Sequence, residues 1–271
     1  MLTAYPPNGR KRANLTYLEE ENVTHSRRSF LIGVPVVAAA AMVTTSASAM
    51  ATPPHQSPIA IRSRSAVDDP ALPELVIDYP DHVDVGIHYI RHDANDPAGC
   101  SIRGPEETIE ADVPAGSAAV LIGGMRYELL QFHFHTRSEH VLDDHHYSLE
   151  QHYVHRGPQG QTLVVALFLT HGGRGGTPQD AVLHTLPQEC GKEREIAVNL
   201  QKSLPDDLST FRYDGSLTTA PYTEGVSWLI LRQHRAVTDA VVDGFEKLFP
   251  KGNARKLQPL NNRTVRYRRQ R

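Results

Sequence analysis

The sequence predicts a single, mainly β domain with a few short helices at its surface. Between residues 75 and 170, short runs of alternating apolar and polar residues follow one another, separated by Pro, Gly, Asp and Asn. This pattern is typical of consecutive strands. Only residues 236–248 have apolar positions at convincing helical spacing. The predicted domain covers residues 50–271 and shows no internal repeat and no second boundary.

The predicted strands occur in order along this domain. They are residues 75–79, 83–89, 108–113, 118–122, 131–135, 150–155, 162–170 and 225–232. The run 162–170 is almost continuously apolar, which is typical of a strand buried on both faces. Residues 178–200 are expected to hold only short helices, because Pro187 interrupts their pattern.

The first 49 residues are predicted to be an export signal that is removed from the mature protein. Arg27 and Arg28 form a twin-arginine pair, the apolar run 32–43 follows, and residues 47–49 match a small-residue cleavage site. The apolar run is too short to cross a bilayer comfortably. An uncleaved N-terminal anchor is the alternative. The signal predicts a periplasmic or extracellular protein with no membrane segment after cleavage.

The composition is that of a globular protein. Hydrophobic residues make up 39% and charged residues 22% of the chain, and the net charge is -3, so nothing indicates a nucleic-acid partner. The two cysteines, Cys100 and Cys190, lie in polar, loop-like surroundings. A disulfide is chemically allowed outside the cytoplasm, but the sequence leaves open whether these two cysteines pair. It also leaves the oligomeric state open.

Two of the predicted strands carry histidines on one face. Gln131, His133 and His135 alternate with phenylalanines, and Glu150 and His152 follow the same alternation in the next strand. If these strands pair antiparallel, three imidazoles converge on one spot. Three neutral histidines with an open fourth position are the ligand set of a catalytic zinc. A lone histidine would more often be a surface or core residue, but three histidines that share one face of two neighbouring strands predict a metal site.

Six motifs support a resemblance to a known family. In chain order they are Gln-Ser-Pro-Ile at 56–59, Gln-Phe-His-Phe-His at 131–135, Ser-Glu-His at 138–140, Glu-x-His-x-Val-His at 150–155, Ser-Leu-Thr-Thr-x-Pro at 216–221 and Pro-Leu-Asn-Asn-Arg at 259–263. Together they resemble the α-class carbonic anhydrases, and the short link at 135–140 is similar to the exported bacterial branch. The resemblance implies a large, mostly antiparallel central sheet. It also implies zinc-dependent, reversible hydration of carbon dioxide to bicarbonate and a proton.

The resemblance also implies roles for individual residues. His133, His135 and His152 would bind zinc. Gln131, Glu150 and the backbone carbonyl of Asn262 would orient these histidines through their outer nitrogens. Thr218 would accept a hydrogen bond from the zinc-bound hydroxide and donate its own proton to Glu139. The residues that match the substrate-binding wall are Val154, Val164, Leu217, Thr219, Val226 and Trp228.

The chain departs from the family pattern at the proton shuttle. Glu107 stands where the shuttling histidine of the family would be. The proton would then leave through Glu107, another histidine or buffer, with slower turnover and stronger buffer dependence. The segment between the predicted cleavage site and Gln56 is also short, so part of one rim of the active site is expected to be missing.

Two other functions compete with this interpretation. His133, His135, Glu139 and His152 also fit a cupin-like site, in which Glu139 would be a ligand and the metal iron or manganese. The second alternative is a non-catalytic binding or structural protein with the same fold. Such proteins typically lose a zinc histidine, whereas this chain keeps all three.

Overall fold

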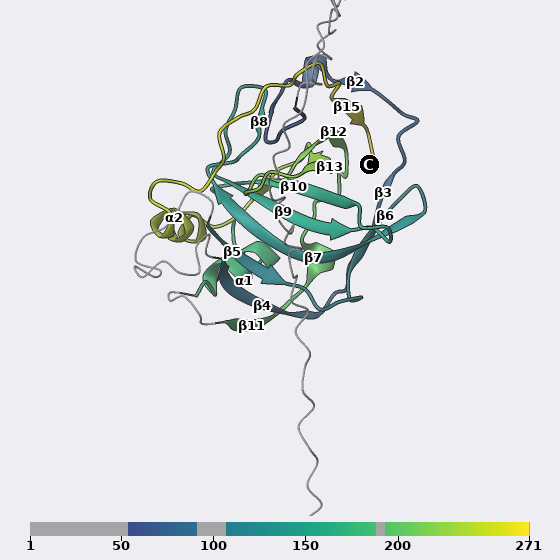
Figure 1. Cartoon of the computed structure of the whole chain (residues 1–271). Coiled ribbons are helices and arrows are strands. Elements are labelled where there is room, and N and C mark those ends of the chain that lie inside the picture. Colours follow the sequence, from purple (N-terminus) through teal and green to yellow (C-terminus); the bar gives the residue numbers. More distant parts are fainter. Residues whose placement is uncertain (1–53, 91–106, 188–192, 271) are drawn as a thin grey trace, which may run out of the picture. The chain divides into compact units, whose positions relative to one another are not determined.

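The computed structural model describes residues 54–90, 107–187 and 193–270 (Figure 1). They belong to one compact unit, Ala51–Arg271. The predicted export signal, Cys100 and Cys190 lie outside the described residues. Within the described part, no helix is long and apolar enough to cross a membrane.

The described part of the chain is built mainly from strands. The strands are β1 (Ala60–Ile61), β2 (Val67–Asp68), β3 (Leu75–Asp78), β4 (Val83–Ile90), β5 (Thr108–Asp112), β6 (Ala119–Ile122), β7 (Met125–Thr136), β8 (Val141–Leu142), β9 (Leu149–Arg156), β10 (Thr162–Thr170), β11 (Arg194–Val198), β12 (Thr210–Ser216), β13 (Glu224–Leu231), β14 (Arg235–Ala236) and β15 (Arg266–Arg268). The helices are α1 (Pro178–His184) and α2 (Asp239–Leu248), with short 3-10 turns η1 (Ser63–Ser65) and η3 (Leu200–Lys202).

One 13-stranded sheet organises these elements. Its main path runs β11-β4-β5-β7-β9-β10-β13-β12-β15-β2, with β3, β6 and β14 paired off this path. The parallel pairs in this sheet join β10 to β13, β10 to β14 and β15 to β2, and the remaining pairs are antiparallel. The predicted mainly β fold with a large, mostly antiparallel sheet is therefore confirmed.

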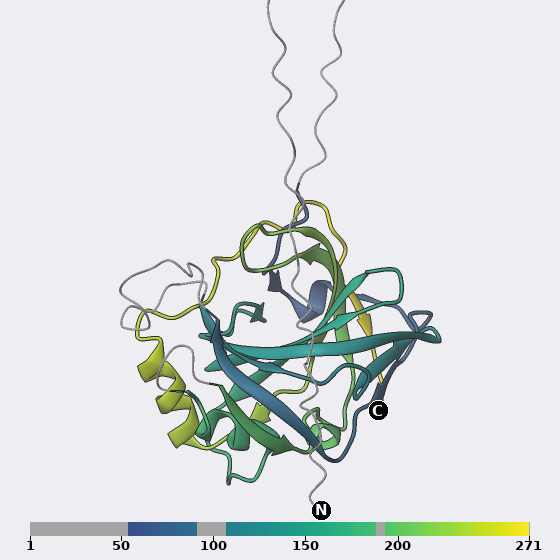
Figure 2. The same ribbon diagram turned by 60° about the horizontal axis from the view of Figure 1, so that its bottom comes forward.

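The two faces of the sheet pack against different cores, because side chains alternate along each strand. Phe132 and Phe134 of β7 join one buried cluster, which also contains Val241 and Phe245 of α2. The Phe134 and Phe245 rings meet at 6.0 Å between centroids. The opposite face holds a second cluster that includes Trp228. We call the face that carries Phe132 and Phe134 the phenylalanine face. Figures 1 and 2 show α2 beside the sheet, and this helix covers the phenylalanine face.

Both helices are short, as expected. Thr177 and Asp180 form a capping box at the start of α1, and the helix ends at His184, before Pro187. Helix α2 begins at Asp239, three residues later than predicted. Arg235 and Ala236 pair with β10 as strand β14 instead, so their backbone groups are taken up by the sheet.

His155 of β9, which is buried on the phenylalanine face, makes the free energy of unfolding depend on pH. His155 is fully buried, its Nδ1 donates to the carbonyl of Leu163 at 3.3 Å, and Nε2 accepts from the Tyr79 hydroxyl at 2.7 Å. Burial lowers the pKa of His155 from 6.5 to about 4. Below pH 6.5 the unfolded chain therefore binds a proton at this residue that the folded chain excludes, and stability falls as the pH falls toward 4.

We expect this one group to remove about 2 kcal/mol of unfolding free energy between pH 7 and pH 5. Urea unfolding of the wild type and of His155→Gln at both pH values measures the effect. The variant should lose less stability over this interval than the wild type. Equal losses in the two proteins would contradict the assignment.

Candidate metal centre

The three predicted ligands come together where β7 pairs with β9. The two strands are antiparallel, which is the condition for convergence, and His133 is the register partner of His152. His135 lies two residues further along β7 on the same face. One ring nitrogen from each of the three histidines lies within 4.8 Å of the others. The ring centroids are 4.7 to 5.2 Å apart, so the three imidazoles surround one point.

Two of the histidines are oriented by side chains from their own strands. Nδ1 of His133 donates to Oε1 of Gln131 at 2.9 Å, and Nε2 of His152 donates to Oε1 of Glu150 at 2.8 Å. These acceptors fix the tautomers, because a carbonyl or carboxylate oxygen requires the ring proton to lie on the bonded nitrogen. Nε2 of His133 and Nδ1 of His152 are left with lone pairs for a cation. Gln131 and Glu150 therefore contact the histidines that the family resemblance assigned to them.

The third histidine is held by a residue that the sequence analysis missed. Nδ1 of His135 donates to the backbone carbonyl of Asn253 at 3.2 Å, so the prediction of Asn262 is wrong. Asn253 follows α2, and its side chain also bonds the backbone of Thr136, which fixes the loop against β7. Asn262 belongs instead to a later turn with positive φ at residues 261 and 262. Nε2 of His135 is buried and has no hydrogen-bond partner.

The electrostatics favour neutral imidazoles at this point. Burial, together with the neighbouring rings of His135 and His152, holds the pKa of His133 well below its ordinary value. Burial also lowers the pKa of His135, although Glu139 opposes this shift. A neutral imidazole with its outer nitrogen bonded offers a lone pair inward. The orphaned Nε2 of His135 and the all-nitrogen donor set therefore fit a divalent metal of the zinc type.

Behind His152 lies a buried chain of hydrogen bonds that sequence reasoning did not find. Glu150 accepts bonds from the ring and the backbone of His140, at 2.7 and 2.8 Å. The His140 ring continues to the hydroxyl of Tyr213 at 2.6 Å, and Tyr213 donates to Oγ of Ser57 at 2.8 Å. Burial alone would raise the pKa of Glu150, but His140 and His152 outweigh it and hold that pKa well below its ordinary value. Glu150 is therefore an ionised anchor for His152.

Glu139 is buried beside the histidines. Its side chain is 1% exposed, and Oε1 accepts the backbone N–H of Arg255 at 2.7 Å. Oε2 is buried without a hydrogen-bond partner, so the hydrogen bond expected from Thr218 is not formed. Thr218 itself is also buried. Among the described residues, no group of three or more ligand atoms includes Glu139, which argues against the cupin-like arrangement.

Most of the predicted substrate wall gathers next to His152. Val164, Val226 and Trp228 are buried in one cluster, against which Val154 and Leu217 pack. The indole of Trp228 lies 4.9 Å from the His152 ring between centroids, and its Nε1 donates to the carbonyl of Ser216. The sixth predicted wall residue, Thr219, is partly exposed in the turn between β12 and β13.

Glu107 does not occupy a position suited to a proton shuttle. It is 6% exposed, and its carboxylate accepts a hydrogen bond from Tyr89. Tyr89 belongs to the buried cluster on the phenylalanine face, opposite the histidines. Glu110 of β5, in contrast, lies on the histidine face as the register partner of His133. Burial and the nearby charge of Asp112 raise the pKa of Glu110 to about 7.

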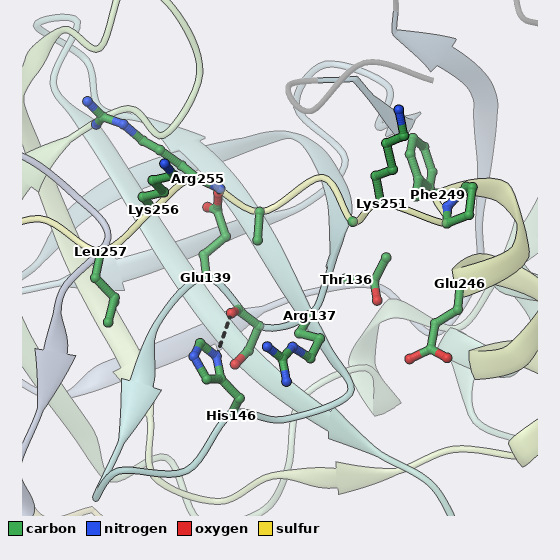
Figure 3. Close-up of a pocket in the computed structure, with 14 residues that line it drawn as sticks. Thr136, Arg137, Glu139, His146, Glu246, Phe249, Lys251, Arg255, Lys256 and Leu257 are labelled. Carbon is green, nitrogen blue, oxygen red and sulfur yellow. Dashed lines mark hydrogen bonds between the residues drawn. The ribbon is translucent and has the colours of Figure 1, made fainter. Parts of the chain in front are cut away.

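A basic pocket adjoins the site behind Glu139. This pocket of about 640 Å³ is lined by residues that include Glu139, Arg137, Arg255 and Lys256, but by none of the three histidines. Figure 3 shows Glu139 beside the backbone of Arg255 and, below it, the hydrogen bond from His146 to the carbonyl of Ser138. The pocket and the histidine cluster therefore share Glu139 as a wall.

Comparison with known proteins agrees with the geometry. The chain matches the model of the eukaryotic-type carbonic anhydrase family over residues 44–269. A carbonic anhydrase of Neisseria gonorrhoeae is 33% identical over 170 residues, which are 62% of this chain and 67% of that protein. One from Nostoc sp. is 37% identical over 162 residues, 59% of this chain and 60% of that protein. The chain thus spans 60% to 67% of the length of these curated relatives.

A solved structure has the same fold. The α-carbonic anhydrase of Thermovibrio ammonificans, in complex with the inhibitor sulfanilamide, matches with a TM-score of 0.67 and 30% sequence identity. The match covers 78% of this chain and 86% of that one. With the family match over most of the chain and three histidines oriented around one point, the chain belongs to the eukaryotic-type, α-class carbonic anhydrase family.

Proposed function

We propose that this protein is a zinc enzyme that hydrates carbon dioxide reversibly to bicarbonate and a proton. The observation that carries the proposal is the histidine cluster, in which Nε2 of His135 is buried without a partner. His133, His135 and His152 would hold the zinc through Nε2, Nε2 and Nδ1. When bound, zinc supplies Lewis acidity that lowers the pKa of a coordinated water to about 7. Membership of the carbonic anhydrase family supports the same activity.

The residues around the histidines have complementary tasks in this proposal. Gln131, Glu150 and the carbonyl of Asn253 orient the three rings, and neutral imidazole ligands would carry no charge that offsets the metal charge. The apolar side chains beside His152 suit carbon dioxide, which has no hydrogen-bond donor and little affinity for polar walls. Thr218 and Thr219 would offer hydroxyls on the polar side. Glu139 would accept the Thr218 proton once the hydroxyl turns toward its unpartnered Oε2.

The proton must leave the site by another route than in relatives with a shuttle histidine. Glu107 bonds Tyr89 and is buried, so it is poorly suited to carry protons to solvent. We therefore propose that external buffer accepts the proton, with a lower maximal rate and a strong dependence on buffer concentration.

Stopped-flow carbon dioxide hydration by the mature, zinc-loaded protein tests both claims. We expect a rate above the buffer blank that rises with buffer concentration over a wide range. Glu107→Gln should leave that dependence unchanged. A rate at the blank would refute the enzyme activity. A rate insensitive to buffer, or one lowered at high buffer by Glu107→Gln, would refute the proposed proton route.

We further propose that the mature protein acts outside the cytoplasm. The twin-arginine pair, the apolar run and the cleavage motif of residues 1–49 support export and removal of this segment. N-terminal sequencing of the protein recovered from the periplasm or medium tests this proposal, with residue 50 as the expected first residue. Retention of the full-length chain in the cytoplasm would contradict it.

A further inference from the structure

A buried arginine lies in a cavity on the face of the sheet opposite the metal centre. Arg212 of β12 is the register partner of Leu229 in β13, and Leu229 belongs to the buried cluster on the phenylalanine face. Arg212 helps to line a cavity of about 520 Å³. The cavity also has apolar walls, from Leu72, Pro73, Ile122, Tyr127, Leu163 and Leu229.

The guanidinium of Arg212 is buried with little direct hydrogen bonding. The residue is only 8% exposed, and Nε donates to Oγ1 of Thr210 at 2.8 Å. Nη2 is buried and has no hydrogen-bond partner. Within the described part of the chain, no carboxylate lies within 4.0 Å of this guanidinium, so Arg212 forms no ion pair there.

Two neighbouring arginines already have carboxylate partners. Arg266, which also lines the cavity, pairs with Asp69 at 3.2 Å, and Arg268 pairs with Glu74 at 2.9 Å. Arg263 donates to three backbone carbonyls. Asp69 and Glu74 are thus engaged by Arg266 and Arg268, whereas Arg212 has one printed side-chain hydrogen bond, to Thr210, and no ion pair among the described residues.

A buried charge without an ion pair is unfavourable, because one hydrogen bond does not replace the water that the guanidinium has lost. Burial and the positive charge of Arg268 lower the pKa of Arg212 to about 10, so the side chain still carries its charge at neutral pH. Neither the zinc chemistry nor the core packing requires a cation at this place. A ligand anion would provide the missing partner.

We propose that this cavity binds a small organic carboxylate, with its carboxylate against Arg212 and its apolar part along Leu72, Tyr127 and Leu229. A guanidinium presents paired N–H donors that match the two oxygens of a carboxylate. The apolar walls favour an aryl or alkyl carboxylate over an inorganic anion. The site is on the other face of the sheet from the histidines and is independent of the proposed hydration activity.

Benzoate is a suitable probe, with benzyl alcohol as its uncharged counterpart. Because carboxylates can also bind near a metal, titration calorimetry is done with the wild type and with His135→Ala. In both proteins we expect a saturable site for benzoate, one per chain, that does not take up benzyl alcohol. Arg212→Met should weaken this binding at least about tenfold. The matched control Arg266→Gln removes a paired arginine of the same cavity and should retain the binding.

The thermal stability of Arg212→Met separates the binding role from a structural one. Removal of an unpaired buried charge should raise Tm in buffer and abolish the further rise that benzoate causes in the wild type. If Arg212→Met does not fold, Arg212→Lys decides the question, since it keeps the charge but not the paired donors and should bind benzoate more weakly. Absence of benzoate binding in the wild type, its loss in His135→Ala, or unchanged affinity in either Arg212 variant would overturn the proposal.

Discussion

The variant His135→Ala is expected to bring carbon dioxide hydration down to the rate of buffer alone. The imidazole of His135 provides one of three inward nitrogens, and it is the one that is buried without any partner in the protein. A site with two remaining imidazoles binds zinc far more weakly, and the coordinated water loses its lowered pKa. Stopped-flow hydration and zinc content after dialysis measure the two consequences.

His146→Ala is the matched control for this variant. His146 belongs to the same histidine-rich stretch, but its Nδ1 bonds the carbonyl of Ser138 and it lies outside the ligand groups. This control should retain both zinc and activity. Full activity of His135→Ala, with one zinc per chain, would disprove the proposed ligand set.

Replacing Phe134 by Ala should have the largest effect on stability. Phe134 is fully buried on the opposite face of β7 from His133 and His135, and its ring contacts those of Phe132 and Phe245 at 6.2 and 6.0 Å between centroids. Loss of a fully buried phenyl ring removes its transfer free energy and leaves a cavity. We expect a loss of about 3–5 kcal/mol in the free energy of unfolding, measured by urea titration.

The control for the packing effect is Val76→Ala. Val76 is 50% exposed in β3, so its truncation should change the unfolding free energy by less than about 0.5 kcal/mol. A loss of less than about 1 kcal/mol in Phe134→Ala would mean that α2 collapses onto the vacated space, and that the helix is less firmly seated than its contacts indicate.

Local pattern was sufficient to predict the histidine strands. Alternation fixes which side chains share a face, so Gln131, His133 and His135 could be assigned together before any pairing was known. The register of His133 with His152 then follows from burying the phenylalanine face. The same reasoning identified the fully buried strand β10 and the amphipathic helix α2.

Contacts made through the backbone across long sequence distances could not be predicted in this way. The carbonyl that holds His135 belongs to Asn253, and every residue has such a carbonyl, so nothing in the sequence marks this one. The position of the Glu107 side chain could not be predicted for a different reason. Glu107 precedes β5, and Tyr89 draws its carboxylate toward the phenylalanine face, which strand parity alone does not reveal.

The sequence position of His140 indicates its role in the site. The sequence places it directly after Glu139 in a Ser-Glu-His motif, and its ring bridges Glu150 and Tyr213. A histidine so close to two metal-binding strands is a candidate for an outer-shell contact. Only the fold, however, identifies Tyr213 and Ser57 as the groups that complete the chain of hydrogen bonds.

The chain of bonds from Glu150 to Ser57 also has a kinetic consequence. Ser57 lies near the start of the described chain and is held by Ser216 and Arg255, while His135 depends on Asn253, 118 positions further on. Contacts between residues so far apart in the sequence form late in folding, because the chain must first lose the conformational entropy of the long loop between them. The metal centre should therefore be completed in one of the last steps of folding. In a refolding experiment, the time at which tight zinc binding appears would then report when the two ends of the domain come together.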